Sequence, residues 1–281
     1  MCIYRKLSAF SPLWRYISFF TRPSPDFLII GANKCGTTTL DKYLRKHPDI
    51  NCAYKKEVHF FDRPSNFNKG FFWYRSQFPI RRMAIYTDLG KPQTIAGEAS
   101  PEYLFHPLVP QRVEKHLPSV KLIVMLRNPV DRAYSHYQMT CRNGNEKLSF
   151  SEAVSAETKR IGTILERMRT EEDFHDIAYE RYSYLSRGLY FEQLQNWMKF
   201  FPREQFLVIK SENFFNNPSD TLEKVLDFLG VAQWAPKELR VSHSGKYKET
   251  MDVRLQAELN EFFAPHNQRL CELLEADFSW T

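Results

Sequence analysis

The sequence "DFLIIGANKCGTTTLDKYLRKHP" (residues 26–48) joins an apolar run, a turn that contains two glycines, and a helical pattern that stops at a proline. The apolar run at residues 27–30 has the length of a buried strand, and the helical pattern covers residues 38–47. Such a turn points backbone N–H groups at an anion, and the helix start adds partial positive charge. The stretch therefore predicts an anion-binding loop between the first strand and the first helix of an α/β fold.

The loop departs from the signature of nucleoside triphosphate-binding proteins, G-x-x-x-x-G-K-[ST]. Gly31 and Gly36 have the required spacing, but Thr37 stands where the signature demands lysine, and Lys34 lies inside the loop. A nucleotide kinase-like protein is therefore the less favoured reading of this loop.

Four further apolar runs have the length of buried strands, at residues 50–53, 94–98, 121–127 and 205–210. Helical patterns separate them, and Asn128 followed by Pro129 marks one more helix start. This alternation predicts a single α/β domain with a P-loop-like parallel sheet and helices on both faces. We expect an N-terminal arm at residues 1–25 and the domain at residues 26–281. The other helical patterns cover residues 107–116, 149–168, 189–200, 219–229 and 252–274.

Composition gives broader expectations. The 281 residues are 43% hydrophobic and carry a net charge of +6, which indicates a folded core and anionic partners. Five scattered cysteines predict neither a disulfide framework nor a zinc site, and favour a reducing compartment. Basic residues interrupt the apolar runs of the N-terminal arm, so we expect no membrane span and a cytoplasmic protein. The arm is expected to pack on the domain, with contact to a membrane surface as the alternative.

The ends of the later strands carry charges that suit an anion better than a magnesium ion. They are Glu98, Arg127 and Lys210, so no metal requirement is expected. Arg127 and Ser135, eight residues apart, can grip a second phosphate from a strand end and a helix. The alternative is that Arg127 only pairs with Asp131 or Glu98, and that Ser135 is a surface hydroxyl. Two phosphate grips favour a nucleotide with phosphates at both its 5′ and 3′ ends.

With these two motifs the sequence resembles the sulfotransferases that use 3′-phosphoadenosine-5′-phosphosulfate (PAPS). The likeness is greatest to the heparan sulfate branch, the glucosaminyl N- and 3-O-sulfotransferases. "LIIGANKCGTTTLDKYLRKHPDI" resembles the 5′-phosphosulfate loop, and "KLIVMLRNPVDRAYSHY" resembles the 3′-phosphate motif. "KEVHFFD", "SPEYLFHPLVPQRV" and "LQNWMKFFP" also resemble the heparan sulfate branch in their order and spacing. The resemblance covers residues 26–281.

The resemblance implies a set of cofactor contacts and no metal. Arg127 and Ser135 would hold the 3′-phosphate. Gly245 and Lys246 lie where the family has a loop over the cofactor phosphates, with lysine here in place of arginine. The 5′-phosphosulfate would be wrapped by Lys34, Cys35, Gly36, Thr37, Thr38 and Thr39.

The resemblance also implies the catalytic groups. Glu57 in "KEVHFFD" matches the glutamate that the family uses as general base, and Lys34 would stabilise the leaving phosphate. His59 would share a face with Glu57 in an extended stretch, where it orients the acceptor or acts as base itself. The alternatives are that Glu57 pairs with Lys55 or Lys56 and that His59 only packs.

The resemblance therefore implies transfer of a sulfuryl group from PAPS to a hydroxyl or amine, with release of 3′,5′-adenosine bisphosphate (PAP). Ala99 replaces the lysine that heparan sulfate 3-O enzymes usually carry after the glutamate, so a small metabolite or natural product fits as well as a saccharide. The alternatives are a nucleotide kinase-like enzyme and a non-catalytic nucleotide-binding module. Nucleic acid is not expected as a partner, and the sequence leaves the oligomeric state open.

Overall fold

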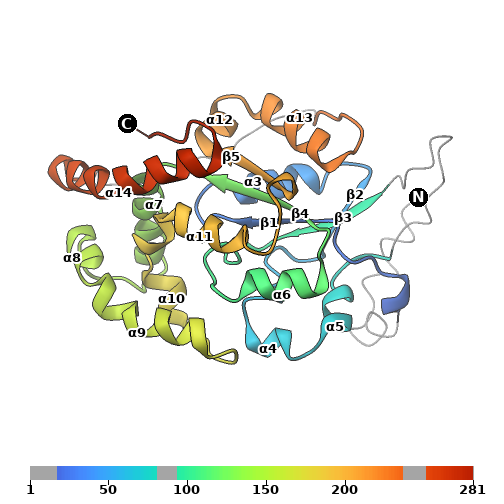
Figure 1. The fold of residues 1–281 in the computed structure, drawn as a ribbon, viewed down its shortest axis with the longest axis horizontal. Coiled ribbons are helices and arrows are strands. Elements are labelled where there is room, and N and C mark those ends of the chain that lie inside the picture. The colour runs from blue at the N-terminus through green and yellow to red at the C-terminus, as the bar shows by residue number, and fades with distance from the viewer. Residues whose placement is uncertain (1–17, 81–93, 237–250, 281) are drawn as a thin grey trace.

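The computed structural model describes residues 18–80, 94–236 and 251–280. Five parallel strands form its central sheet in the order β2-β3-β1-β4-β5 (Figure 1). Each strand falls where the sequence predicts one, with bounds that differ by one or two residues. The strands are β1 (Phe27–Gly31), β2 (Ile50–Cys52), β3 (Ile95–Ala99), β4 (Lys121–Leu126) and β5 (Phe206–Lys210).

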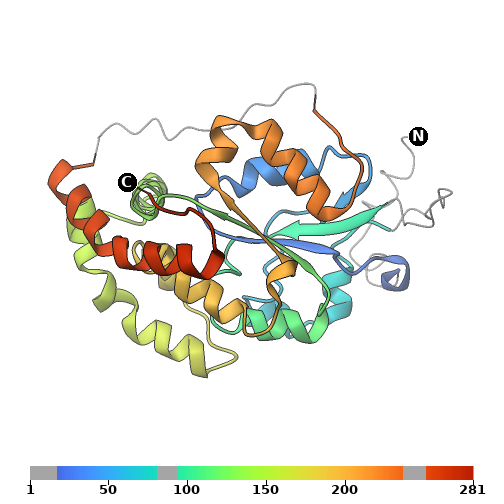
Figure 2. The same ribbon diagram turned by 45° about the horizontal axis from the view of Figure 1, so that its top comes forward.

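Helices cover both faces of the sheet, as predicted. Figures 1 and 2 together show α3, α12 and α13 on one side of the sheet and α4, α5 and α6 on the other. The remaining helices gather at one end, where β4 leads into α7. The helices are α3 (Thr37–Leu44), α4 (Pro64–Phe67), α5 (Phe71–Arg75), α6 (Val109–His116), α7 (Pro129–Arg142), α8 (Phe150–Ser155), α9 (Glu157–Thr170), α10 (Ile177–Tyr182), α11 (Tyr190–Trp197), α12 (Ser211–Asn216), α13 (Pro218–Leu229) and α14 (Val253–Leu274), with 3-10 turns η1 (Phe19–Thr21), η2 (Ser186–Gly188) and η3 (Arg203–Gln205).

The predicted helix at residues 149–168 is wrong as a single element. It consists of α8 and α9, which meet at Ala156. The start of α8 is fixed by a capping box between Ser149 and Glu152, which satisfies two backbone donors at once. The short helices α4, α5, α10 and α12 escaped the prediction because fewer than two turns give no helical period.

The two strands at the centre of the sheet are buried on both faces, as expected of parallel strands between helix layers. Every residue of β1 is buried, and so are the last five residues of β4. Beside them a second apolar cluster joins α7, α8, α14 and the segment at residues 182–189, with Tyr134, Phe150 and Phe263 among its buried members. This cluster fixes α7, which follows the end of β4, against the rest of the domain.

Part of the N-terminal arm is described, from residue 18 onward. Arg22 is buried and donates hydrogen bonds to the Phe78 carbonyl and, at 3.1 Å, to the Tyr54 hydroxyl. This end of the arm therefore packs on the domain. Residues 1–17 lie outside the described part of the chain, and the domain boundary at residue 26 stays a prediction.

The strand order directs ligands to the end of β1. The chain passes from β1 to β2 and β3 on one side, and then crosses to β4 and β5 on the other. Beyond the strands, the backbone N–H of Ser100 donates to Ile29 and that of Leu104 donates to Ile30. The N–H of Glu57 likewise donates to the carbonyl of Ala99 at 2.9 Å. The carboxyl ends of β1 and β3 therefore carry the loop and the Glu57 segment at one edge of the sheet.

We expect Gly97→Ala to destabilise the domain. An added Cβ would lie 2.3 Å from the ring of Phe27, the residue opposite Gly97 in the ladder between β1 and β3. Overpacking of this kind typically costs about 1–3 kcal/mol, which urea unfolding measures. Gly162→Ala in α9 is the matched control, because its Cβ meets nothing within 4 Å and alanine is the better helix former. Equal stability of the two variants would contradict the packing argument.

Candidate active site

The anion-binding loop has the predicted position, between β1 and α3. Gly36 caps α3 with a φ of 90°, and a side chain there would meet the ring of Phe215 at 2.8 Å. The first hydrogen bonds of the helix come from the N–H groups of Thr39 and Leu40 to the Gly36 carbonyl. Helix geometry leaves the preceding N–H groups directed out of the helix start, where an anion can accept from them.

The side chains of the loop differ in their access to a ligand. The thiol of Cys35 is fully buried, and burial raises its pKa to about 11, so only the backbone of Cys35 can serve a ligand. Thr37 and Thr39 are also buried, whereas Thr38 is exposed. The hydroxyl of Ser211, the first residue of α12, donates to the Cys35 carbonyl at 2.8 Å and so fixes the loop.

Lys34 turns from the loop toward α7. Its Nζ lies 3.5 Å from the Sδ of Met139, which sits one turn beyond Ser135 on the same face of that helix. The structure therefore brings together the loop lysine and the helix face that carries Ser135. The prediction of two neighbouring phosphate-binding groups requires this proximity. Ser135 itself is buried, so its predicted alternative as a surface hydroxyl is wrong.

The surroundings of Lys34 are strongly positive. Burial lowers the pKa of the lysine, and the charges of Arg142, Arg127 and Arg132 lower it further. Arg132 is fully buried and donates to the Tyr184 carbonyl, while its Nε and Nη1 have no partner among the described residues. Such a group of cations repels itself, and an anion that binds beside it relieves the repulsion.

Arg127 lies at the start of α7, directly after β4. Its Nη2 is 3.5 Å from the carboxylate of Asp131, and its guanidinium lies over the ring of Phe215. The predicted alternative pairing with Asp131 is thus present, and the pairing with Glu98 is not, because Glu98 is buried elsewhere. The half-exposed ion pair with Asp131 is weak, which leaves Arg127 able to bind a ligand.

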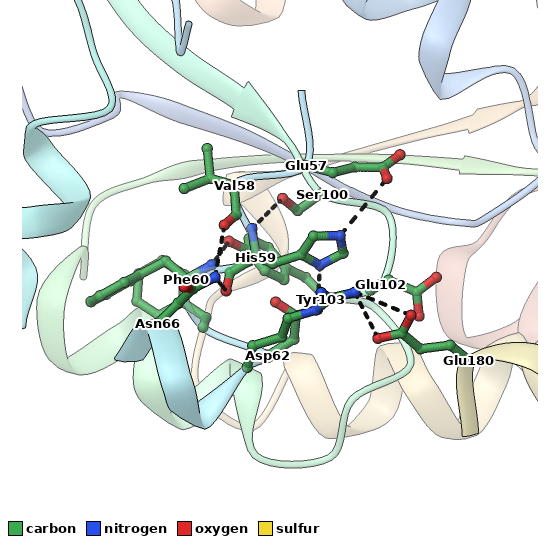
Figure 3. A network of polar contacts seen from close by, with 12 residues as sticks. Glu57, Val58, His59, Phe60, Asp62, Asn66, Ser100, Glu102, Tyr103 and Glu180 are labelled. Carbon is green, nitrogen blue, oxygen red and sulfur yellow. Dashed lines mark hydrogen bonds and ion pairs between the residues drawn. The ribbon is translucent and has the colours of Figure 1, made fainter. Parts of the chain in front are cut away.

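The second group of charges lies on the segment after β2, and Figure 3 shows it from close by. The Nε2 of His59 is 3.8 Å from the Oε2 of Glu57, and its Nδ1 is 2.6 Å from the Oδ2 of Asp62. Lys56 also pairs with Glu57 through its Nζ, as the alternative reading expected. The imidazole is therefore held between two carboxylates, and we call Glu57, His59 and Asp62 the relay.

The backbone of the relay is not extended, contrary to the prediction. Glu57 has a φ of 61° and His59 a φ of 54°, so both are in the left-handed region that non-glycine residues rarely adopt. Their side chains still meet, because two left-handed residues bend the segment around Val58. Together with Lys34 at 72°, the site supplies three of the four positive-φ residues other than glycine in the described chain. Strain that gathers in this way is typical of functional sites.

Electrostatics fixes the charges of the relay. The contact with His59 is the main cause that lowers the pKa of Glu57 to about 2; burial opposes it and Lys56 adds to it. Burial alone would lower the pKa of His59, but the hydrogen bond with Asp62 and the contact with Glu57 outweigh it and raise the pKa to about 10. At neutral pH the relay thus contains an imidazolium at His59 beside an ionised carboxylate at Glu57.

Glu98 supports the relay from within the protein. It is 1% exposed and accepts hydrogen bonds from Tyr74, Tyr103 and Ser100 at 2.6 to 2.9 Å, and from the Val58 N–H at 3.3 Å. Of the charged strand ends that the sequence assigned to an anion site, Glu98 is thus buried among its own donors instead. Lys210 donates to the Ser279 carbonyl near the C-terminus.

Two of the predicted cofactor residues cannot be placed in the site. Gly245 and Lys246 lie outside the described residues, so their predicted contact with the cofactor stays a prediction. Asp62 was missed, although its spacing of three residues from His59 was a usable signal.

Within residues 18–80, 94–236 and 251–280, no group of three His, Cys, Asp or Glu side chains could hold a metal ion. None of the described helices is long and apolar enough to cross a membrane.

Comparison with known proteins identifies the family of the chain. The sulfotransferase domain family matches residues 24–239. Human heparan sulfate glucosamine 3-O-sulfotransferase 6 is 30% identical over 92% of this chain and 74% of its own length. The membrane-associated sulfotransferase kil1 of Dictyostelium discoideum is 28% identical over 91% of this chain, which spans 66% of that relative.

Solved structures give the same picture of the fold. A sulfotransferase from Alicyclobacillus acidocaldarius is 35% identical, with a TM-score of 0.67, over 91% of this chain and 98% of its own. Mouse SULT7A1, solved with PAP, is 15% identical with a TM-score of 0.52 over 94% of each chain, which is a likeness of fold alone. The domain match sets aside the kinase-like and non-catalytic readings. The chain therefore belongs to the sulfotransferase family, near its heparan sulfate branch, and is a sulfuryl-transferring enzyme.

Proposed function

We propose that the enzyme transfers a sulfuryl group from PAPS to a hydroxyl or amine of its acceptor and releases PAP. One observation carries this proposal: an ionised carboxylate relay and a cationic anion-binding loop lie at the carboxyl ends of neighbouring strands, β3 and β1. PAPS, when bound, supplies a sulfuryl group attached to a phosphate that can leave. The chain must then bind two phosphates, support the departing charge and accept one proton.

The residues at the loop fit the phosphates of PAPS. The N–H groups at the start of α3 and the amine of Lys34 suit the 5′-phosphosulfate, because they combine the helix dipole with a positive charge. Arg127 and Ser135 suit the 3′-phosphate from the start of α7. The unpaired nitrogens of Arg132 add positive potential beneath the loop.

Glu57 suits the role of base better than His59 does. His59, with a pKa of about 10, already holds a proton at neutral pH and cannot take another. Glu57 is ionised, and its side chain is 43% exposed, whereas that of His59 is 12% exposed. A carboxylate with a pKa of about 2 is weakly basic, so it accepts the proton only as the new bond to sulfur makes the acceptor O–H or N–H acidic.

His59 then orients and stabilises Glu57. Its Nδ1–H donates to Asp62, which fixes the ring with Nε2 facing Glu57. The Nδ2 of Asn66 donates hydrogen bonds to the carbonyl oxygens of Val58 and His59, at 3.3 and 3.0 Å. These bonds maintain the bend of the segment.

For the acceptor, we propose a small metabolite, a natural product or a saccharide. Ala99 is fully buried at the end of β3, so this position offers the acceptor no cation. A cytoplasmic location remains part of the proposal, as does contact of the N-terminal arm with a membrane surface.

Glu57→Gln should lower turnover with PAPS about 10²- to 10⁴-fold, because it removes the base and leaves the phosphate contacts in place. The dissociation constant for PAP, measured by calorimetry, should stay within about threefold of the wild-type value. Glu166→Gln on the exposed surface of α9 is the matched control and should keep full turnover. Turnover of Glu57→Gln within a few-fold of wild type would remove Glu57 from the role of base.

PAP should stabilise the protein against heat, by about 2.7 kcal/mol at 100 times its dissociation constant. Arg127→Ala should reduce the preference for PAP over adenosine 5′-phosphate about tenfold or more, because a charged hydrogen bond to the 3′-phosphate is lost. Arg254→Ala is the control, since its side chain is 89% exposed on α14. Stabilisation by ATP with magnesium and not by PAP would sink the cofactor assignment.

The stability that His59 contributes should depend on pH. Its folded pKa of about 10 is above its ordinary 6.5, so the contribution is full below pH 6.5 and disappears as pH rises through 10. Glu57 adds a contribution that is full above pH 4.5 and disappears as pH falls through 2. Urea unfolding should therefore show a larger loss for His59→Gln at pH 5.5 than at pH 9.5. A loss that is equal at both pH values would contradict the charged relay.

A further inference from the structure

We propose that Glu102 and Arg187 act through Asn33 as positioning residues that hold Lys34 in place beside α7. The proposal rests on the proposed role of Lys34 in sulfuryl transfer. It concerns three side chains that lie outside the relay and the phosphate contacts described above. We call Asn33, Glu102 and Arg187 the tether.

Two hydrogen bonds define the tether from end to end. The Nδ2 of Asn33, the residue before Lys34, donates to the Oε1 of Glu102 at 2.9 Å. The other oxygen, Oε2, accepts from the Nη2 of Arg187 at 2.6 Å. Because each oxygen of Glu102 has a different partner, the carboxylate links the loop to the segment that ends in η2.

The far end of the tether is rigid. Arg187 is 2% exposed, and its Nε donates to the Ser183 hydroxyl at 3.1 Å while Nη2 also reaches the Tyr179 carbonyl at 3.3 Å. Its guanidinium lies over the rings of Phe105 and Tyr179, at 4.7 and 5.3 Å. An arginine fixed on so many sides orients the carboxylate of Glu102, which is itself 8% exposed.

Lys34 needs such a tether for two reasons. Its φ of 72° is unfavourable for a residue with a side chain, so the backbone gains by relaxing unless its neighbours prevent it. Its ammonium group also faces the positive charges of Arg142, Arg127 and Arg132, which repel it. The contact with the Met139 sulfur at 3.5 Å is too weak to hold a charged amine against both effects.

The simpler interpretation is that Glu102 and Arg187 form a structural ion pair. Asn33 would then only donate a hydrogen bond to the remaining carboxylate oxygen of Glu102. The two readings differ in what happens to Lys34 when Asn33 is removed. Asn33→Ala breaks the link and leaves the buried pair of Glu102 and Arg187 intact, so the fold is expected to survive. This variant therefore carries the test.

The test is an NMR titration of the ¹³C-methylated lysines of the full chain without ligand, with Lys34→Arg used to assign the signal. In the wild type Lys34 should titrate below the other lysines, because it is buried among cations. In Asn33→Ala the amine should move into solvent, and its pKa should rise toward the ordinary lysine value. Asn68→Ala is the matched control, since Asn68 makes a similar bond to Asp173 on the surface. An unchanged Lys34 titration in Asn33→Ala would overturn the proposal.

A rescue pair separates positioning from general loosening. Asn33→Asp alone places a second carboxylate against Glu102 and should release Lys34. Asn33→Asp combined with Glu102→Gln reverses the hydrogen bond, restores the charge count and should return the Lys34 titration toward the wild-type value. A double variant no closer to wild type than Asn33→Asp would count against the tether.

Kinetics distinguishes this proposal from the proposed function. Lys34→Ala should lower the turnover of PAPS strongly, and Asn33→Ala should lower it about tenfold or more with PAP affinity nearly unchanged. Wild-type turnover in Lys34→Ala would refute the catalytic role of Lys34, whatever the titration shows. A slow Lys34→Ala beside a fully active Asn33→Ala would refute the tether alone.

Discussion

The hydrogen bonds to the buried carboxylate of Glu98 are the interaction on which the relay depends. Burial raises its pKa, although Tyr74, Tyr103, Ser100 and the N–H of Val58 all donate to it. A group so costly to desolvate is stable only with every donor in place. Since Val58 separates Glu57 from His59, the same carboxylate holds the bend that lets their side chains meet. Glu98 thus converts the end of β3 into a fixed support for the relay.

The two sides of the site oppose each other in charge, and each side carries strain. Lys34 lies among arginines at the end of β1, whereas Glu57 and Asp62 enclose His59 beside β3. Neither arrangement would form in an isolated peptide, because like charges and left-handed residues both disfavour it. The parallel sheet stabilises both arrangements, because β1 and β4 are buried on both of its faces. Its strand order places the loop with Lys34 and the segment with Glu57 at the same edge of the sheet.

Much of this could be predicted from local sequence, and the failures have a common cause. Strands and the cap of α7 by Asn128 are set by short-range patterns, so their positions were predictable. The roles of Glu98 and Glu102 depend on distant partners as well as near ones. Tyr74 is 24 positions from Glu98 and Arg187 is 85 positions from Glu102, and no periodicity reveals such pairs. The left-handed backbone of His59 was missed for the same reason. It is imposed by contacts from other segments, whereas spacing alone suggested an extended chain.

The three side chains of the relay differ in their exposure to solvent. The side chain of Asp62 is 4% exposed and that of His59 is 12% exposed, so neither can meet an acceptor without a change in the backbone. Glu57, at 43%, is the member of the relay that an incoming hydroxyl or amine can reach. Its partner Lys56 holds only one carboxylate oxygen and can be displaced by an acceptor. In the proposed function the buried pair therefore acts through Glu57, and Glu57 is the residue that we propose both touches the acceptor and receives its proton.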